Sequence, residues 1–285
     1  MSTYKLSFEQ IRQDPGLSDM LSALERGFQQ FGIDYYLVGA VSRDVWMAGI
    51  NKITPTRTTG DIDFAVLIND KGVYEVLKEY LVKEEGFSPY NNNAFVLIYK
   101  DGTEVDLLPF GEVEDTGRSV TVIGSGYNKI HVDGFKEVYE NRLPEIEVGN
   151  HKFKFCSLPG IVLLKMIAWN DRPESRPDDI LDLSDILKHY FDMNSENIYE
   201  NHLDLFEQED FALLDVSATV IGREIRNIVI RSTQLYERIR KILEDNSTDS
   251  NSRMAEIMTR HFDNTIEENV RLIQRMKTGI EDDRS

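Results

Sequence analysis

Apolar and polar residues follow two different spacings along the chain, and the spacing changes near residue 155. Before that point, short apolar runs bounded by turn residues stand between segments whose apolar residues recur every three or four positions. The short runs predict strands and the periodic segments predict helices. From Ser157 onwards almost every segment has the helical spacing. We therefore expect an α+β chain with two domains, a mixed β-sheet flanked by helices over 1–155 and a helical domain over 156–285.

The first domain carries clear turn and capping signals. Ser18 is the N-cap candidate of the opening helix, and one hairpin turns at Asp101–Gly102 while another turns at Gly149–Asn150. The expected strands are 34–39, 61–68, the hairpin 94–110, 118–124, 144–150 and 151–157, and the expected helices are 18–33, 40–49 and 71–84. In the second domain the expected helices are 157–171, 176–191, 212–229, 232–245 and 253–279.

Composition narrows the class of protein. The chain has 285 residues, a net charge of -18 and a single cysteine, Cys156, which lies in an apolar run and is expected to be a buried, inert thiol. No run of about 18 apolar residues occurs, and the N-terminus lacks the apolar core of a secretory signal, so we expect a cytoplasmic protein that does not span a membrane. The negative charge argues against tight non-specific binding to nucleic acid, although it leaves room for a local basic groove.

Two aspartates interrupt an apolar strand in the segment "TGDIDFAV". Residues i and i+2 of a strand share one face, so Asp61 and Asp63 project together while Ile62 and Phe64 face the core. Two carboxylates held this way repel each other, and a divalent cation with oxygen ligands such as Mg²⁺ removes the conflict. Asp106, in "EVDLLPF", offers a third carboxylate on a strand expected beside the first. Glu104 shares its face, and we prefer Asp106 because apolar residues flank it.

Three carboxylates on adjacent strands predict a two-metal site for phosphoryl transfer. An anion cradle lies upstream, where a strand passes through Gly39 and Ala40 into a helix start. Ser42 adds a hydroxyl there, and Arg43 and Arg57 are the positive candidates for a triphosphate. The plainer alternatives are that Arg43 pairs with its helix neighbour and that Arg57 is a solvated charge.

Taken in order, "VGAVSRDVWMAG", "TGDIDFAV" and "EVDLLPF" resemble the pattern of the nucleotidyltransferase superfamily. The resemblance implies that Asp61, Asp63 and Asp106 are metal ligands and that the turn from Gly39 to Ser42 holds the nucleotide. Ala40 departs from the pattern, since Gly or Ser usually stands there. Either the Ser42 hydroxyl replaces the missing one, or the backbone alone holds the nucleotide.

The segment "LPGIVLLKMIAWNDRPESRPDDILDLSDIL" resembles the corresponding segment of AbiEii-type nucleotidyltransferases. In that group a helix with a lysine leads through an arginine-containing loop to a helix with paired aspartates. Lys165 matches the lysine, which implies a catalytic contact with the triphosphate, and Asp179 and Asp182 match the pair. Pro-Asp replaces the usual Arg-Lys before Asp179, where Arg172 and Arg176 are candidate substitutes. The alternative is a helix-edge lysine paired with Asp182.

These features predict a Mg²⁺-dependent enzyme that moves a nucleoside monophosphate from an NTP to an acceptor hydroxyl. The resemblance implies a toxin-like enzyme that modifies RNA, including tRNA, and a possible antitoxin partner. The alternatives are an aminoglycoside-like enzyme with a small hydroxylated, cationic acceptor, a tRNA 3′-end synthetase, and a degenerate fold that binds nucleotide or a partner protein without catalysis. The sequence does not specify the acceptor, the base of the NTP, the oligomeric state or the role of residues 191–285.

Overall fold

The chain folds into two compact units, Met1–Ser157 and Leu158–Ser285. The computed structural model describes residues 2–11, 16–54, 56–57, 59–207, 211–248 and 251–283. The boundary between the units lies two residues beyond the expected one at residue 155. Within the described part of the chain, no helix is both long and apolar enough to cross a membrane.

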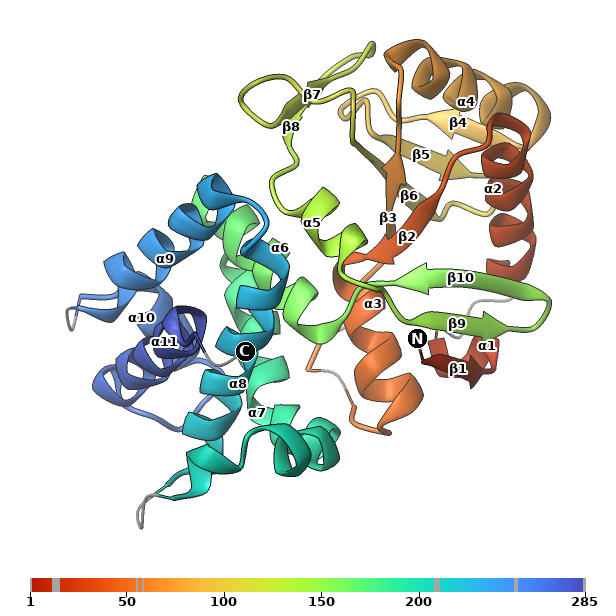
Figure 1. Cartoon of the computed structure of the whole chain (residues 1–285). Coiled ribbons are helices and arrows are strands. Elements are labelled where there is room, and N and C mark those ends of the chain that lie inside the picture. Colours follow the sequence, from red (N-terminus) through yellow and green to blue (C-terminus); the bar gives the residue numbers. More distant parts are fainter. Residues whose placement is uncertain are drawn as a thin grey trace. The chain divides into compact units, whose positions relative to one another are not determined.

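The first unit is built on an eight-stranded mixed sheet with the order β1-β9-β10-β2-β3-β6-β5-β4, which confirms the expected fold class (Figure 1). Three neighbouring pairs are parallel, namely β1 with β9, β10 with β2, and β3 with β6. A separate two-stranded ladder joins β7 (Ser119–Thr121) and β8 (Lys129–His131). The strands of the large sheet are β1 (Thr3–Leu6), β2 (Tyr35–Val38), β3 (Asp61–Leu67), β4 (Phe87–Pro89), β5 (Val96–Tyr99), β6 (Glu104–Phe110), β9 (Glu145–Val148) and β10 (His151–Phe155).

One face of this sheet is sealed by two helices, α2 (Leu17–Phe31) and α4 (Lys71–Glu84). The ring of Phe28 on α2 packs edge to face on Phe64 of β3, with centroids 6.3 Å apart. Phe64 and its neighbour Ile62 are buried, and the strand period of two turns Asp61 and Asp63 to the opposite face. The apolar half of β3 therefore forms core, and its acidic half lies on the other side.

The acidic face carries the short helix α5 (Phe135–Glu140) at the Phe110 end of β6. The rings of Phe110 and Phe135 stack at 6.4 Å, and the hydroxyl of the fully buried Tyr36 donates a hydrogen bond to the carbonyl of Phe135 at 2.9 Å. Asp106 and Phe110 share this face because their positions differ by four along the strand. Packing on this face thus covers the end of the strands away from the aspartates.

The second unit contains α6 (Leu158–Asp171), α7 (Pro177–Asn201), the 3₁₀ turn η2 (Leu203–Phe206), α8 (Leu213–Val229), α9 (Thr233–Ser247), α10 (Arg253–Met258) and α11 (Ile266–Glu281). Helices α8 and α11 touch through their backbones at Gly222 and Gly279. A Cβ on Gly222 would overlap the carbonyl oxygen of Met276 and lie 3.0 Å from the Cα of Gly279. Glycine at both positions therefore allows this close crossing.

Several sequence expectations need correction. The opening helix begins at Leu17 after Gly16, so Ser18 lies inside the helix and is not its N-cap. The expected helix 253–279 is two helices, because Thr265 starts α11 with a capping box that it forms with Glu268. The helix expected over 40–49 is a short α-helix, α3 (Gly39–Asp44), that continues as the π-helical turn η1 (Val45–Ile50).

Six further short elements were not expected from the sequence, namely β1, α1 (Phe8–Ile11), β4, β8, α5 and η2. In addition, α7 runs ten residues further than expected, to Asn201, with a non-helical Asn194 inside it.

Candidate functional site

Two of the expected metal ligands lie in one row of the sheet. In the parallel pairing of β3 with β6, Asp63 is the direct partner of Asp106. Neighbouring strands lie about 4.8 Å apart and paired residues point to the same side, so the two carboxylates project side by side. Both residues are only partly buried. The third strand of the row is β2, whose last residue, Val38, pairs with Asp63 from the other side.

Asp61 occupies the next row, where its partner on β6 is Glu104. Glu104 is exposed, whereas Asp106 is partly buried. The hydroxyl of Thr59 donates a hydrogen bond to Oδ1 of Asp61. This contact was not anticipated from the sequence, although a hydroxyl residue two positions before the first aspartate is a visible signal. The register agrees with the preference for Asp106 over Glu104, since Asp106 is the one paired with Asp63.

Gly39 brings the backbone directly against Asp63. The glycine has φ +68°, a left-handed conformation that favours glycine, and it opens α3 directly after β2. A Cβ at this position would overlap Oδ2 of Asp63 and lie 2.7 Å from its Cγ. The space that a side chain would fill is therefore occupied by the carboxylate.

The Ser42 hydroxyl is engaged inside the unit. Ser42 is fully buried, and its Oγ donates a hydrogen bond to the carbonyl of Cys156 at 3.2 Å. The same carbonyl accepts a bond from Nε1 of Trp46 at 2.8 Å. Ala40 is also buried. Of the two alternatives for this turn, a nucleotide held by backbone groups fits this arrangement better than one held by the Ser42 hydroxyl. Cys156 is buried as expected, and burial raises the pKa of its thiol well above the usual value.

Arg43 forms its contacts inside the first unit. Its side chain is fully buried, donates from Nε and Nη2 to Oδ1 of Asp44 at 2.8 and 2.6 Å, and donates from Nη2 to the carbonyl of Arg57 at 2.8 Å. These contacts connect α3 to the loop before β3 and include the expected pairing with a helix neighbour. A contact of Arg43 with the nucleotide stays a prediction. Arg57 itself is only partly buried, and its role toward a triphosphate stays a prediction.

Lys165 lies on α6 in the second unit and is almost completely buried. Its Nζ forms ion pairs with Oδ1 of Asp179 at 3.0 Å and Oδ2 of Asp182 at 2.6 Å. Burial by itself lowers the pKa of this ammonium group, but the charges of the two aspartates outweigh it and leave the pKa raised. Arg176, at the start of α7, pairs with the other oxygen of Asp179 at 2.9 Å. The pairing of Lys165 with Asp182 is confirmed, and its contact with a triphosphate stays a prediction.

The donor set of the sheet suits a hard divalent cation. Asp61, Asp63 and Asp106 supply only carboxylate oxygens, which Mg²⁺ prefers, and the close approach of Gly39 keeps one side of the cluster free of side-chain bulk. Within the described residues, no three His, Cys, Asp or Glu side chains already converge as a complete set of metal ligands. The chemistry of the three aspartates fits Mg²⁺, and their roles as ligands stay predictions.

Comparison with known proteins identifies the family. The family model of the nucleotidyl transferase AbiEii toxin of type IV toxin–antitoxin systems matches residues 23–273, which is most of the chain. The protein belongs to this family and is a nucleotidyltransferase. None of the curated proteins compared with the chain matches its sequence. Among solved structures, that of the antibiotic-resistance factor ANT(2″)-Ia in solution is similar with a TM-score of 0.37 and 10% identity, covering 82% of this chain and 98% of that chain.

Proposed function

We propose that the protein transfers a nucleoside monophosphate from an NTP to a hydroxyl group, using Mg²⁺ held by Asp61, Asp63 and Asp106. The observation that carries the proposal is the row in which Asp63 pairs with Asp106 while the start of α3 at Gly39 lies against Asp63. Two carboxylates and the amino end of a helix thus meet at one point. Backbone N–H groups at a helix start favour phosphate oxygens, and carboxylates favour the cation that accompanies them.

Each part of the chain has a defined task in this reaction. The backbone from Gly39 to Ser42 binds phosphate oxygens, and Asp61 and Asp63 hold the cation that accompanies the triphosphate. Asp106 orients the acceptor hydroxyl for in-line attack on the α-phosphate. Bound Mg²⁺ neutralises charge on the phosphates and the leaving pyrophosphate.

The acceptor in this proposal is a hydroxyl group of RNA, tRNA included, as the resemblance to AbiEii-type enzymes implies. In this proposal the enzyme is cytoplasmic and has an antitoxin as a partner. The charge of -18 favours the second candidate, a small cationic molecule with hydroxyl groups, because an acidic protein attracts cations and repels RNA phosphates.

The experiment incubates the protein with each α-³²P-labelled NTP and Mg²⁺, and offers either total tRNA or a set of aminoglycosides. Label in tRNA supports the first acceptor, and label in an aminoglycoside supports the second. Asp63→Asn should abolish both signals, whereas Glu104→Gln should retain them because Glu104 is exposed and lies in the other row. Label incorporation that survives Asp63→Asn would refute the proposed site.

A further inference from the structure

A group of apolar side chains is exposed at one place in the second unit. Eight large hydrophobic residues of the described chain are strongly exposed, and four of them fall between residues 199 and 213. They are Tyr199 at 52%, Leu203 at 60%, Phe211 at 43% and Leu213 at 47%. Single exposed apolar residues are normal on a protein surface, but a local concentration of them marks a contact site.

These side chains belong to one connected set of rings. Tyr199 stacks on Phe206 with centroids 5.3 Å apart, and Phe206 packs edge to face on Phe211 at 5.0 Å. Phe191 contacts both Tyr199 and Phe206, at 5.7 and 6.3 Å. We call this group, together with Leu203 and Leu213, the aromatic patch. The rings come from α7, from η2 and from a residue just before α8.

The sequence around the aromatic patch contains acidic residues but neither lysine nor arginine. No Lys or Arg occurs between Lys188 and Arg223. The exposed acidic residues of this segment that the structure describes are Asp192, Glu196, Glu200 and Glu207. Some exposed acids elsewhere in the second unit are paired along their helices, as Asp245 is with Lys241 at 2.9 Å. An apolar centre with one sign of charge around it resembles half of an interface.

We propose that the aromatic patch docks a cationic polypeptide segment, whose apolar side chains pack on Tyr199 and Leu203 while its Lys or Arg side chains pair with Glu196 and Glu200. Charge complementarity selects this occupant. A second copy of the chain would bring the same acidic surroundings against themselves, and an anionic lipid surface or a nucleic acid would be repelled. This docking function is separate from nucleotidyl transfer and does not depend on it.

The test uses the full chain and a fluorescein-labelled amphipathic peptide of Lys and Leu with one Trp, followed by fluorescence anisotropy at about 0.15 M salt. We expect saturable binding to the unmodified protein. Tyr199→Ser combined with Leu203→Ser should weaken it by about tenfold or more, and Glu196→Gln combined with Glu200→Gln should weaken it and reduce its salt dependence. The substituted side chains are all exposed, and a thermal melt of each variant verifies that it is folded.

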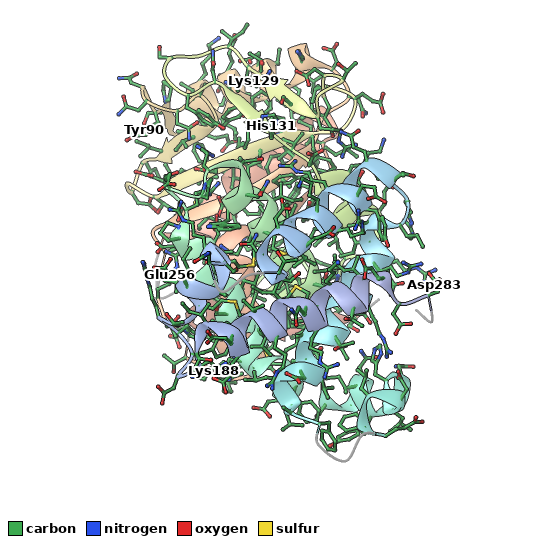
Figure 2. The ribbon with its side chains drawn as sticks, turned by 90° about the vertical axis from the view of Figure 1, so that its left-hand side faces the viewer. Tyr90, Lys129, His131, Lys188, Glu256 and Asp283 are labelled. Carbon is green, nitrogen blue, oxygen red and sulfur yellow. The ribbon has the colours of Figure 1, made fainter. Side chains whose placement is uncertain are left out.

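Matched controls separate docking from the general attraction of a peptide to an acidic protein. Glu256→Gln combined with Glu267→Gln removes the same charge from exposed positions of the same unit, and Ile123→Ser removes an apolar side chain that is 78% exposed in the first unit (Figure 2 labels Glu256). Both controls should bind the peptide as the unmodified protein does. Equal weakening by the controls, or no saturable binding, would overturn the proposal.

Two other outcomes would also overturn it by assigning the aromatic patch to another occupant. Dimerisation in sedimentation velocity that Leu203→Ser abolishes would assign the patch to a second copy. Binding to anionic vesicles that depends on Tyr199 would assign it to lipid.

Discussion

The carboxylate of Asp63 fills the space that a side chain at the position of Gly39 would need. The glycine lies at the end of β2 with φ +68°, and any Cβ there would overlap Oδ2 of Asp63. The position of Asp63 on β3 therefore requires a residue without a side chain at the start of α3. The sequence pattern of a glycine after an apolar strand thus has a local steric cause in this protein.

Gly39→Ala should therefore damage both the fold and the site. We expect a loss of about 1–2 kcal/mol in the free energy of unfolding from the left-handed backbone, with a further cost from displacing Asp63, and a loss of nucleotidyl transfer. Urea unfolding and the labelled-NTP assay measure the two effects. Gly32→Ala is the matched control, since Gly32 has φ +63° with nothing within 4 Å of its Cβ position. It should show the backbone cost alone and keep full activity, and equal activity losses in the two variants would contradict this explanation.

Asp106 and Glu104 lie on the same face of β6 and have different partners, which makes them separable by substitution. Asp106→Asn should lower the rate of transfer by about 100-fold or more, because it removes the carboxylate that lies beside Asp63 in the register of the sheet. Glu104→Gln should change the rate less than about threefold, because Glu104 is exposed beside Asp61. Steady-state rates at saturating NTP and Mg²⁺ measure both effects. A larger loss of rate in Glu104→Gln than in Asp106→Asn would show that Glu104 is the third ligand.

We expect Lys165 to contribute mainly to the stability of the folded second unit. Lys165→Met leaves the buried carboxylates of Asp179 and Asp182 without their ammonium partner, and we expect a loss of about 3–5 kcal/mol in the free energy of unfolding. Lys188→Met is the control on α7, since Lys188 is exposed, and it should change stability by less than about 0.5 kcal/mol (Figure 2).

A Trp46→Phe background makes this measurement specific to the second unit, because Trp169 is then the only tryptophan. Unfolding followed by its fluorescence reports the unit that contains Lys165. An unchanged unfolding curve together with lost NTP turnover would instead favour the triphosphate contact that the family resemblance implies.

His202 should make the second unit less stable in mild acid. Burial, and secondarily the guanidinium of Arg223, lower the pKa of His202, whose Nδ1 lies 3.0 Å from Nη1 of that arginine. Because the unfolded chain binds the proton first, near pH 6.5, the contribution of this histidine to stability is present above that pH and is lost as the pH falls toward 5. Unfolding of the Trp46→Phe protein at pH 7.5 and at pH 5 should show this loss.

His202→Gln should reduce the loss of stability between pH 7.5 and pH 5. Other titrating groups should still contribute to the pH dependence. Glu224 acts in the opposite direction, since burial raises the pKa of its carboxyl group and protonation of that group in acid favours the folded state. His131→Gln, at an exposed position of the first unit, is the control and should keep the original slope. The same slope in His202→Gln would show that this histidine does not titrate as its surroundings indicate.

The sequence predicted those parts of the structure that depend on local pattern. The hairpins at Asp101–Gly102 and Gly149–Asn150 form as expected, and the strand of Asp61 and Asp63 lies beside the strand of Asp106. The direction of side chains at the helix start was not predictable in this way. Ser42 bonds to the carbonyl of a residue 114 positions away, and only the assembled sheet brings the two together.

The capping error at Ser18 has a similar origin. Serine before a periodic run is typical of an N-cap, but here the hydroxyl lies 3.3 Å from Nε2 of His151 on β10, and the helix has already begun. Lys165 was different, since an isolated lysine in an apolar helix needs a buried partner and the sequence offered Asp182. Local pattern therefore predicts elements and the need for partners, while tertiary packing decides which polar groups remain available to a ligand.

The strand order also determines when the fold can be completed during synthesis. The strands that carry Asp63 and Asp106 leave the ribosome early. The other neighbour of β2 is β10, which is synthesised later, and β1 likewise pairs with the late strand β9, with Thr3 opposite Glu145. At roughly 5–20 residues per second, several seconds separate the emergence of Phe110 from that of Phe155. During that interval β2 has an open edge, and the nascent chain carries its acidic residues on an incomplete sheet.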